Sequence, residues 1–173
     1  DVRITTPDVK LADPKELAGE HEEQCVVTQI DFSGGLVGEN LLLLSLENAR
    51  KLAAVMLASY GQVPEEVPGD DLTEVELSAV SEIMNQMMGA SAKAYGELLS
   101  EVVEITPPEV EVRDVTGSLM SDLEDGEDSE LVTTSFSLMV DGEVSTQVLQ
   151  VMEAPFAREL ASTMMNSFVI DEE

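Results

Sequence analysis

The segments "VRITTPDVKL" (residues 2–11) and "VEITPPEVEV" (residues 103–112) decide the fold, because they are two copies of one sequence. Five of their ten positions are identical, and Pro7 aligns with Pro108. Internal similarity of this kind is typical of a chain built from repeated structural units. We therefore expect two related halves.

A second match extends the repeat. "ARKLA" (residues 49–53) and "ARELA" (residues 157–161) are identical at four of five positions, so Arg50 aligns with Arg158. The first match lies at an offset of 101 residues and the second at an offset of 108, so the second half contains seven extra residues. The acidic run "SDLEDGEDSE" at 121–130 predicts a surface loop that holds them. We expect one domain over 1–173, with copy one at about 1–60 and copy two at about 70–170.

Both copies follow the same order of predicted elements. An extended segment with a central proline precedes a β-rich stretch, at 25–46 in copy one and 131–152 in copy two. Alternating Val, Thr, Ile and Phe, interrupted by "SGG" or "DG", is typical of β-hairpins. A helix then follows, predicted at 47–59 and at 155–168.

A longer helix opens copy two, predicted over 72–100 with Asp70 or Asp71 as its N-cap. The equivalent helix of copy one falls before residue 1, so we expect copy one to lack its first helix. The pattern predicts an α/β fold: a pseudo-twofold repeat with helices packed on both faces of a mixed or antiparallel sheet.

Charge and hydropathy exclude several kinds of partner. Eight basic and 36 acidic residues give a formal net charge of −28. Phosphate-rich surfaces require Lys and Arg, so we expect no binding to nucleic acid. A bilayer span needs about 20 apolar residues in a row, and the chain has no such run, so we expect no membrane insertion.

Cysteine and histidine give no support for thiol chemistry or a metal site. Cys25 is the single cysteine and lies in an apolar run, which favours a buried inert thiol. His21 is the single histidine. In the acidic run, aligning Gly126 with the sixth position of a calcium loop puts Leu123 at a ligand position and Val132 where the bidentate Glu belongs. We therefore expect no metal site.

A polar stripe marks the predicted long helix. Ser78, Glu82 and Asn85 are spaced i, i+4 and i+7, which places them on one helical face. The simplest interpretation is a solvated face. The alternative is that the three side chains act on a partner.

The stripe and a distant proline together carry a resemblance. The pattern Ser78-x3-Glu82-x2-Asn85-x22-Pro108 resembles the signature of the CheC/CheX/FliY family of chemotaxis phosphatases, and the chain looks most like the middle domain of its FliY-type members. The resemblance implies a pseudo-twofold α/β fold and dephosphorylation of the response regulator CheY. It implies that Asn85 positions the attacking water, that Glu82 docks and orients the regulator, that Ser78 is accessory, and that Pro108 is a structural marker.

The resemblance also implies partners and a location. Phosphorylated CheY is the expected substrate, and the flagellar switch proteins FliM, FliN and FliG are expected partners in the cytoplasmic switch complex of the basal body. No cofactor of its own is expected, because the magnesium ion belongs to the regulator. The alternative is a non-catalytic switch scaffold of the FliM type. "SYGQVPEE" (residues 59–66) stands where that type carries a Gly-Gly-x-Gly motif for FliG, which leaves direct FliG binding open.

Overall fold

The computed structural model describes residues 2–20, 24–63, 71–115, 130–140 and 144–170. In chain order its elements are β1 (Val2–Ile4), β2 (Asp8–Ala12), α1 (Pro14–Glu20), β3 (Gln24–Gly34), β4 (Gly38–Ser45), α2 (Leu46–Ser59), α3 (Glu74–Leu99), β5 (Val103–Ile105), β6 (Glu109–Asp114), β7 (Leu131–Val140), β8 (Val144–Glu153) and α5 (Ala154–Ile170).

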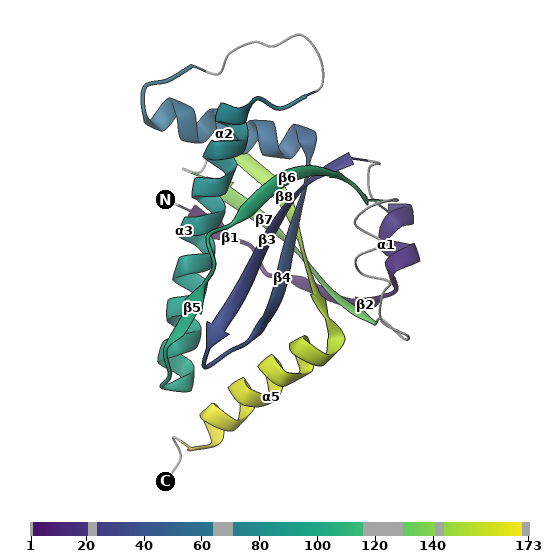
Figure 1. Ribbon diagram of the computed structural model, residues 1–173, viewed down its shortest axis with the longest axis vertical. Coiled ribbons are helices and arrows are strands. Elements are labelled where there is room, and N and C mark those ends of the chain that lie inside the picture. The colour runs from purple at the N-terminus through teal and green to yellow at the C-terminus, as the bar shows by residue number, and fades with distance from the viewer. Residues whose placement is uncertain (1, 21–23, 64–70, 116–129, 141–143, 171–173) are drawn as a thin grey trace.

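The described strands form a single sheet of eight (Figure 1). Its path is β1-β7-β8-β4-β3-β5, with β2 also paired to β7 and β6 also paired to β3. All of these pairings are antiparallel. Each hairpin of one copy thus carries on its outer side the two short strands that flank the proline of the other copy, which joins the two copies into one sheet.

The pairing of the two central strands has twofold symmetry. Leu42 lies opposite Gln150, its own counterpart at the offset of 108. On either side, Leu41 pairs with Val151, which is the counterpart of Leu43, and Leu43 pairs with Leu149, which is the counterpart of Leu41. The predicted pseudo-twofold repeat is confirmed, and its axis passes through the Leu42–Gln150 pair.

The strand register corrects the position of the extra residues. Asp8 pairs with Ser135 and its counterpart Glu109 pairs with Gln29, so β3 and β7 correspond at an offset of 106. Five of the seven extra residues therefore lie between β6 and β7, and two lie in the β7–β8 hairpin. The sequence alone places all seven in the acidic run at 121–130, which apart from Glu130 lies outside the described residues.

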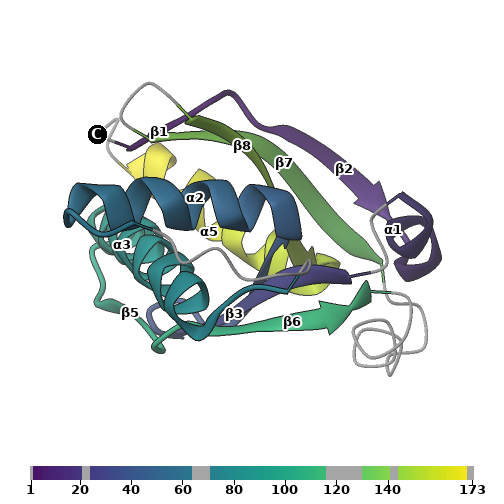
Figure 2. The same cartoon turned by 90° about the horizontal axis from the view of Figure 1, so that it is seen from above.

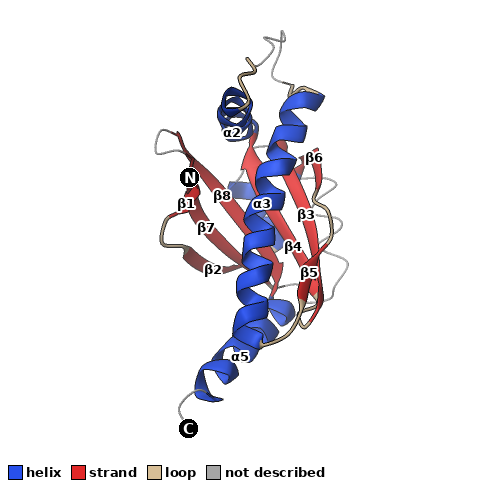
Figure 3. Ribbon diagram, turned by 90° about the vertical axis from the view of Figure 1, so that its left-hand side faces the viewer, coloured by secondary structure: helices blue, strands red, loops and turns tan. Residues whose placement is uncertain are grey.

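Helices cover the two faces of the sheet unequally (Figures 2 and 3). Helices α2, α3 and α5 pack on one face, where alternate strand residues form the larger core with them; its sheet members include Val26, Ile30, Phe32, Leu42, Leu44, Phe136 and Leu138. Leu17 of α1 packs on the opposite face against a smaller cluster that includes Cys25, Val27, Leu41, Leu43 and Leu131. Cys25 is a buried free thiol, as expected.

Helix α3 covers the strands of one copy and leaves the equivalent strands of the other copy uncovered. It packs against β5 and β6, and Ile105 and Val110 join the core beneath it. Their counterparts in copy one, Ile4 and Val9, are exposed, and the described residues place no helix over them. That copy one lacks its first helix stays a prediction, because it concerns chain before residue 1.

Helix α1 was not predicted, although its sequence carries the signals for it. Asp13 is its N-cap, accepting hydrogen bonds at Oδ1 from the backbone N–H groups of Lys15 (2.8 Å) and Glu16 (2.9 Å). Pro14 stands at the first helical position, where its missing N–H costs nothing. The helix has only seven residues, too few for a hydrophobic period to reveal it.

Asn40 is a polar residue in the core beneath α3. It is fully buried, its amide nitrogen lies 3.9 Å from the Met88 sulfur, and its Oδ1 has no hydrogen-bond partner. The counterpart of Asn40 in β8 is Val148, which is also buried. An unsatisfied buried amide costs about 1–3 kcal/mol.

We expect Asn40→Val to raise the free energy of unfolding by about 1 kcal/mol, because it removes that desolvated amide and restores the residue of the other half. The thermal midpoint should rise by about 2–4 °C. Thermal unfolding followed by circular dichroism measures this, with Val148→Asn as the mirror variant that should be destabilised. A lower midpoint for Asn40→Val would show that the amide is stabilising where it is.

Candidate functional site

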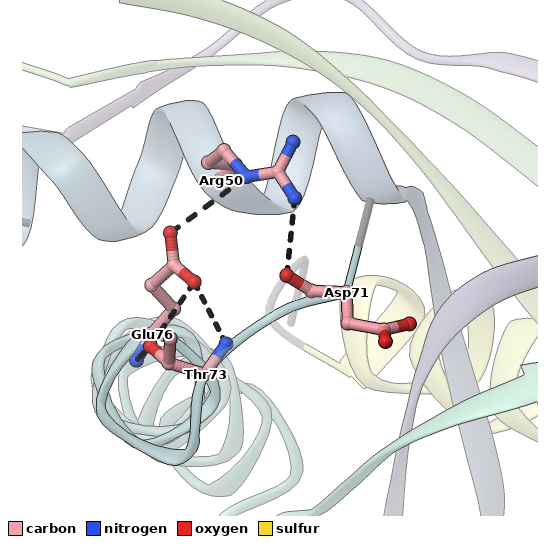
Figure 4. A network of polar contacts seen from close by, with 4 residues as sticks. All are labelled: Arg50, Asp71, Thr73 and Glu76. Carbon is pink, nitrogen blue, oxygen red and sulfur yellow. Dashed lines mark hydrogen bonds and ion pairs between the residues drawn. The ribbon is translucent and has the colours of Figure 1, made fainter. Parts of the chain in front are cut away.

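The helix that carries the polar stripe begins at a capping box (Figure 4). The Thr73 hydroxyl accepts the backbone N–H of Glu76 at 3.1 Å, and the Glu76 carboxylate accepts the backbone N–H of Thr73 at 2.8 Å. Each residue satisfies a backbone donor that a helix start would otherwise leave unpaired. The N-cap is therefore Thr73, and the expected cap at Asp70 or Asp71 was wrong, because the reciprocal bond requires the residue three before Glu76.

Arg50 ties this helix start to α2 (Figure 4). Its Nε lies 3.8 Å from Oε1 of Glu76, and a second guanidinium nitrogen donates to the Asp71 carbonyl at 3.2 Å. The Glu76 side chain is only 6% exposed. Removing the cation would leave a buried carboxylate with less compensation, so Arg50 and the cap act together to fix where α3 begins.

We expect Thr73→Ala to lower the free energy of unfolding by about 1 kcal/mol, because the first turn loses its side-chain acceptor. The thermal midpoint should fall by about 2–4 °C. Ser78→Ala is the matched control, since Ser78 is an exposed hydroxyl within the same helix. Equal midpoints for the two variants would contradict the role assigned to the cap.

Beyond its cap, α3 separates buried and exposed residues cleanly. Val80, Met84, Met87, Met88 and Ala92 are buried against the sheet, whereas Leu77 and Leu99 are only partly buried. This apolar face packs the helix against the sheet. Side chains on the opposite face of α3 therefore project from a helix whose orientation is fixed by this packing.

Ser78, Glu82 and Asn85 all lie on that other face and are exposed, as expected. A step of three residues falls just short of one full helical turn, so Asn85 lies on nearly the same side of the helix as Glu82. The carboxylate and the amide therefore project side by side. The Asn85 amide offers both a donor and an acceptor to a partner. Its exposure is what the catalytic interpretation requires.

Gln86 joins this group, and the sequence analysis did not single it out. Its Nε2 donates to Oε1 of Glu82 at 2.7 Å, and both side chains are exposed. The i, i+4 spacing of a Gln and an acid was the available signal. The bond restricts the rotamers of Glu82 while leaving its other carboxylate oxygen available.

Pro108 lies in the link between β5 and β6, at the sheet edge that α3 covers, and is partly buried. The link is held to β3 by two hydrogen bonds between Asp31 and Thr106, at 2.9 and 3.0 Å. Pro108 interrupts the strand because it has no N–H to donate. This agrees with a structural place for Pro108 rather than a chemical one.

Tyr95 anchors the second half of the helix. Its ring packs edge-on against Phe32 with ring centroids 5.9 Å apart. Burial raises the pKa of the Tyr95 phenol above its ordinary value, so the ring stays neutral at physiological pH. Tyr95 therefore supports the position of α3 and supplies no charge to the polar face.

The described part of the chain offers neither a grouped metal-ligand set nor a membrane-spanning helix. Across those residues, no three or more His, Cys, Asp or Glu side chains are grouped so that they could hold a metal ion. No described helix combines the length and the apolar character needed to cross a membrane. His21 lies outside the described residues.

Comparison with known proteins supports the resemblance carried by the motif. The model of the CheC-like family matches residues 75–112, a stretch that contains Ser78, Glu82, Asn85 and Pro108. The chain is 34% identical over 172 residues to the flagellar motor switch phosphatase FliY of Bacillus subtilis (strain 168). That alignment covers 99% of this chain and 44% of the relative. The resemblance to FliY is confirmed.

Solved structures extend the CheC-like resemblance to three dimensions. The crystal structure of Thermotoga maritima FliY matches with a TM-score of 0.81 and 27% identity, covering 96% of this chain and 83% of that one. A CheX–CheY complex with BeF3 and Mg²⁺ from Borrelia burgdorferi matches with a TM-score of 0.53 and 15% identity, covering 88% of this chain and 83% of that one. The second likeness shows a shared fold alone. The FliY-like domain therefore has the predicted α/β architecture.

Proposed function

We propose that this FliY-like domain hydrolyses the aspartyl phosphate of the phosphorylated response regulator CheY. One observation carries the proposal: Glu82 and Asn85 lie exposed and side by side on helix α3, within the stretch that matches the CheC-like family and at the spacing of the signature that this chain resembles. The Bacillus relative bears the name of a flagellar motor switch phosphatase, which supports the same activity. The chain spans 44% of that relative, so the activity is inferred for this domain from its own residues.

The chemistry needs few groups from this domain. In an aspartyl phosphate, water attacks phosphorus in line, the new P–O bond forms, and the bond to the aspartate oxygen breaks to release the carboxylate. Positioning supplies most of the catalysis in such phosphoryl transfers. The Asn85 amide can hold that water through its carbonyl oxygen while its NH2 group donates to a phosphoryl oxygen. The magnesium ion is assigned to the regulator.

Glu82 is assigned to docking. Its carboxylate lies beside Asn85, and the hydrogen bond from Gln86 limits its freedom, so it meets the regulator already oriented. Prior ordering of a side chain lowers the entropy lost on binding. Ser78 lies one turn before Glu82 on the same face and contributes to the contact, whereas Pro108 belongs to the supporting sheet edge.

The cellular context is proposed from the same resemblance. A FliY-like domain would act within the flagellar switch complex, on the cytoplasmic side of the basal body, together with FliM, FliN and FliG. Phosphorylated CheY would then lose its phosphate where it acts. The non-catalytic scaffold of the FliM type remains the competing function, and it makes no use of an exposed Glu82 and Asn85.

Phosphate release from phosphorylated CheY tests the proposal. The domain should accelerate release over the regulator's own rate, and Glu82→Ala should raise KM and lower kcat. Glu159→Ala is the matched control, because Glu159 is an exposed helical glutamate on α5, away from the polar face of α3. A domain that leaves the regulator's own rate unchanged would establish the scaffold instead.

A further inference from the structure

The polar face of α3 does not end at Asn85. Gly89 lies four residues beyond Asn85 and seven beyond Glu82, which places it on the same face of the helix one turn further along. A glycine inside a helix costs about 1 kcal/mol of stability relative to alanine. Its presence in the middle of a 26-residue helix therefore calls for a physical reason.

The packing of the domain supplies a reason for Gly96 but none for Gly89. A Cβ at Gly96 would lie 2.8 Å from the Glu101 carbonyl oxygen, so the returning chain needs a glycine there. A Cβ at Gly89 would meet nothing within 4 Å. Within the domain, an alanine at position 89 would fit and would strengthen the helix.

The space in front of Gly89 belongs to an open trough between α3 and β5. The trough has a volume of about 800 Å³, and Gly89, Lys93 and Gly96 line its helix side. Residues 101–106 line the other side, along the strand that Figure 3 shows beside the second half of α3. The trough therefore begins one turn beyond Asn85, so a molecule bound over Asn85 would extend into it.

We propose that Gly89 is a specificity-determining residue: its missing side chain lets the phosphorylated regulator approach α3 closely enough for the Asn85 amide to reach the aspartyl phosphate. This inference rests on the proposed function. A side chain at position 89 would stand between the two surfaces and hold them apart. The glycine thus lowers the stability of the free helix and permits close docking.

The test compares two leucine substitutions on one helix. Gly89→Leu places a bulky side chain on the polar face, and Ala94→Leu places the same side chain at an exposed position on the opposite side of α3. Steady-state hydrolysis of phosphorylated CheY and thermal unfolding are measured on both. Gly89→Leu should lower kcat/KM about tenfold or more, mainly through KM, because overpacking an interface is costly. Ala94→Leu should leave kcat/KM unchanged.

Gly89→Ala provides the second readout. It should raise the thermal midpoint by about 2–4 °C, while lowering kcat/KM less than Gly89→Leu does. A gain in stability with a loss of activity is the opposite of what a structural glycine would give. If Gly89→Leu keeps the kcat/KM of the wild type, or if Ala94→Leu loses as much, the inference is overturned.

Failure of the proposed function is distinguishable from failure of this inference. The dissociation constant for the regulator that carries BeF3 in place of the phosphoryl group is measured for the wild type and for Gly89→Leu. If the wild-type domain binds the regulator but does not hydrolyse its phosphate, the proposed function is contradicted. In that case the docking role of Gly89 is still supported if Gly89→Leu binds the regulator more weakly than the wild type does. Equal binding by the two proteins overturns that role whatever the activity.

Discussion

Replacing Asn85 by alanine should reduce the hydrolysis of phosphorylated CheY by about a hundredfold. Loss of one positioned polar group from a reaction centre typically costs about 3 kcal/mol of transition-state stabilisation. Asn85 is exposed, so its removal leaves no cavity and no unpaired buried group. Alanine is also the better helix former, so the free energy of unfolding should stay equal or rise by a few tenths of a kcal/mol.

The measurement is phosphate release from phosphorylated CheY, with thermal unfolding recorded on the same samples. Asn166→Ala is the matched control, since Asn166 is an exposed helical asparagine on α5. Asn166→Ala should change neither the rate of phosphate release nor the thermal midpoint. Hydrolysis that survives in Asn85→Ala would remove Asn85 from the mechanism and favour the scaffold of the FliM type.

Gly34→Ala should cause the largest loss of stability, about 3 kcal/mol. Gly34 has a φ of +90°, which costs an L-residue about 1–2 kcal/mol. An added Cβ would also lie 2.2 Å from the carbonyl oxygen of Val102, which accepts the backbone N–H of Gly35 at 2.9 Å, and Gly34 itself pairs with Val103 across β3 and β5. Neither strand can move away without breaking the ladder, so the steric cost of overpacking adds to the backbone cost.

Gly61→Ala separates the two contributions. Gly61 also has a positive φ, +72°, but a Cβ there would meet nothing within 4 Å. It should cost only the backbone term, about 1 kcal/mol. Urea unfolding of both variants gives the two free energies. Similar losses for Gly34→Ala and Gly61→Ala would show that β5 yields to the methyl group.

The alternation of apolar residues and the repeat predicted most of the fold. Hairpins were expected at 25–46 and 131–152, and β3–β4 and β7–β8 occupy them. A strand exposes alternate residues to opposite faces, so its pattern is visible in a short stretch of sequence. The helix ends were less well predicted, because a cap such as Thr73 depends on one reciprocal hydrogen bond rather than on a period.

The polar face of the candidate site was predictable for the same reason. Ser78, Glu82 and Asn85 share a face because a helix repeats every 3.6 residues, whatever surrounds it. Their exposure followed from the apolar residues that alternate with them, which had to be buried. The i, i+4 spacing of Glu82 and Gln86 also indicates that their side chains can meet, although spacing alone does not say which rotamers form the hydrogen bond.

By itself, then, the sequence determined the repeat, because the two copies share identical residues at offsets of 101 and 108. It also determined which residues share the face of α3, because that depends on the local helical period. Only the tertiary structure decided that Leu42 and Gln150 meet on the axis, that Arg50 holds the start of α3, and that Gly96 is crowded whereas Gly89 is open. These facts depend on contacts between residues far apart in the chain. Such contacts are set by how the two halves pack, and a local sequence pattern does not specify which residues from elsewhere in the chain will lie beside it.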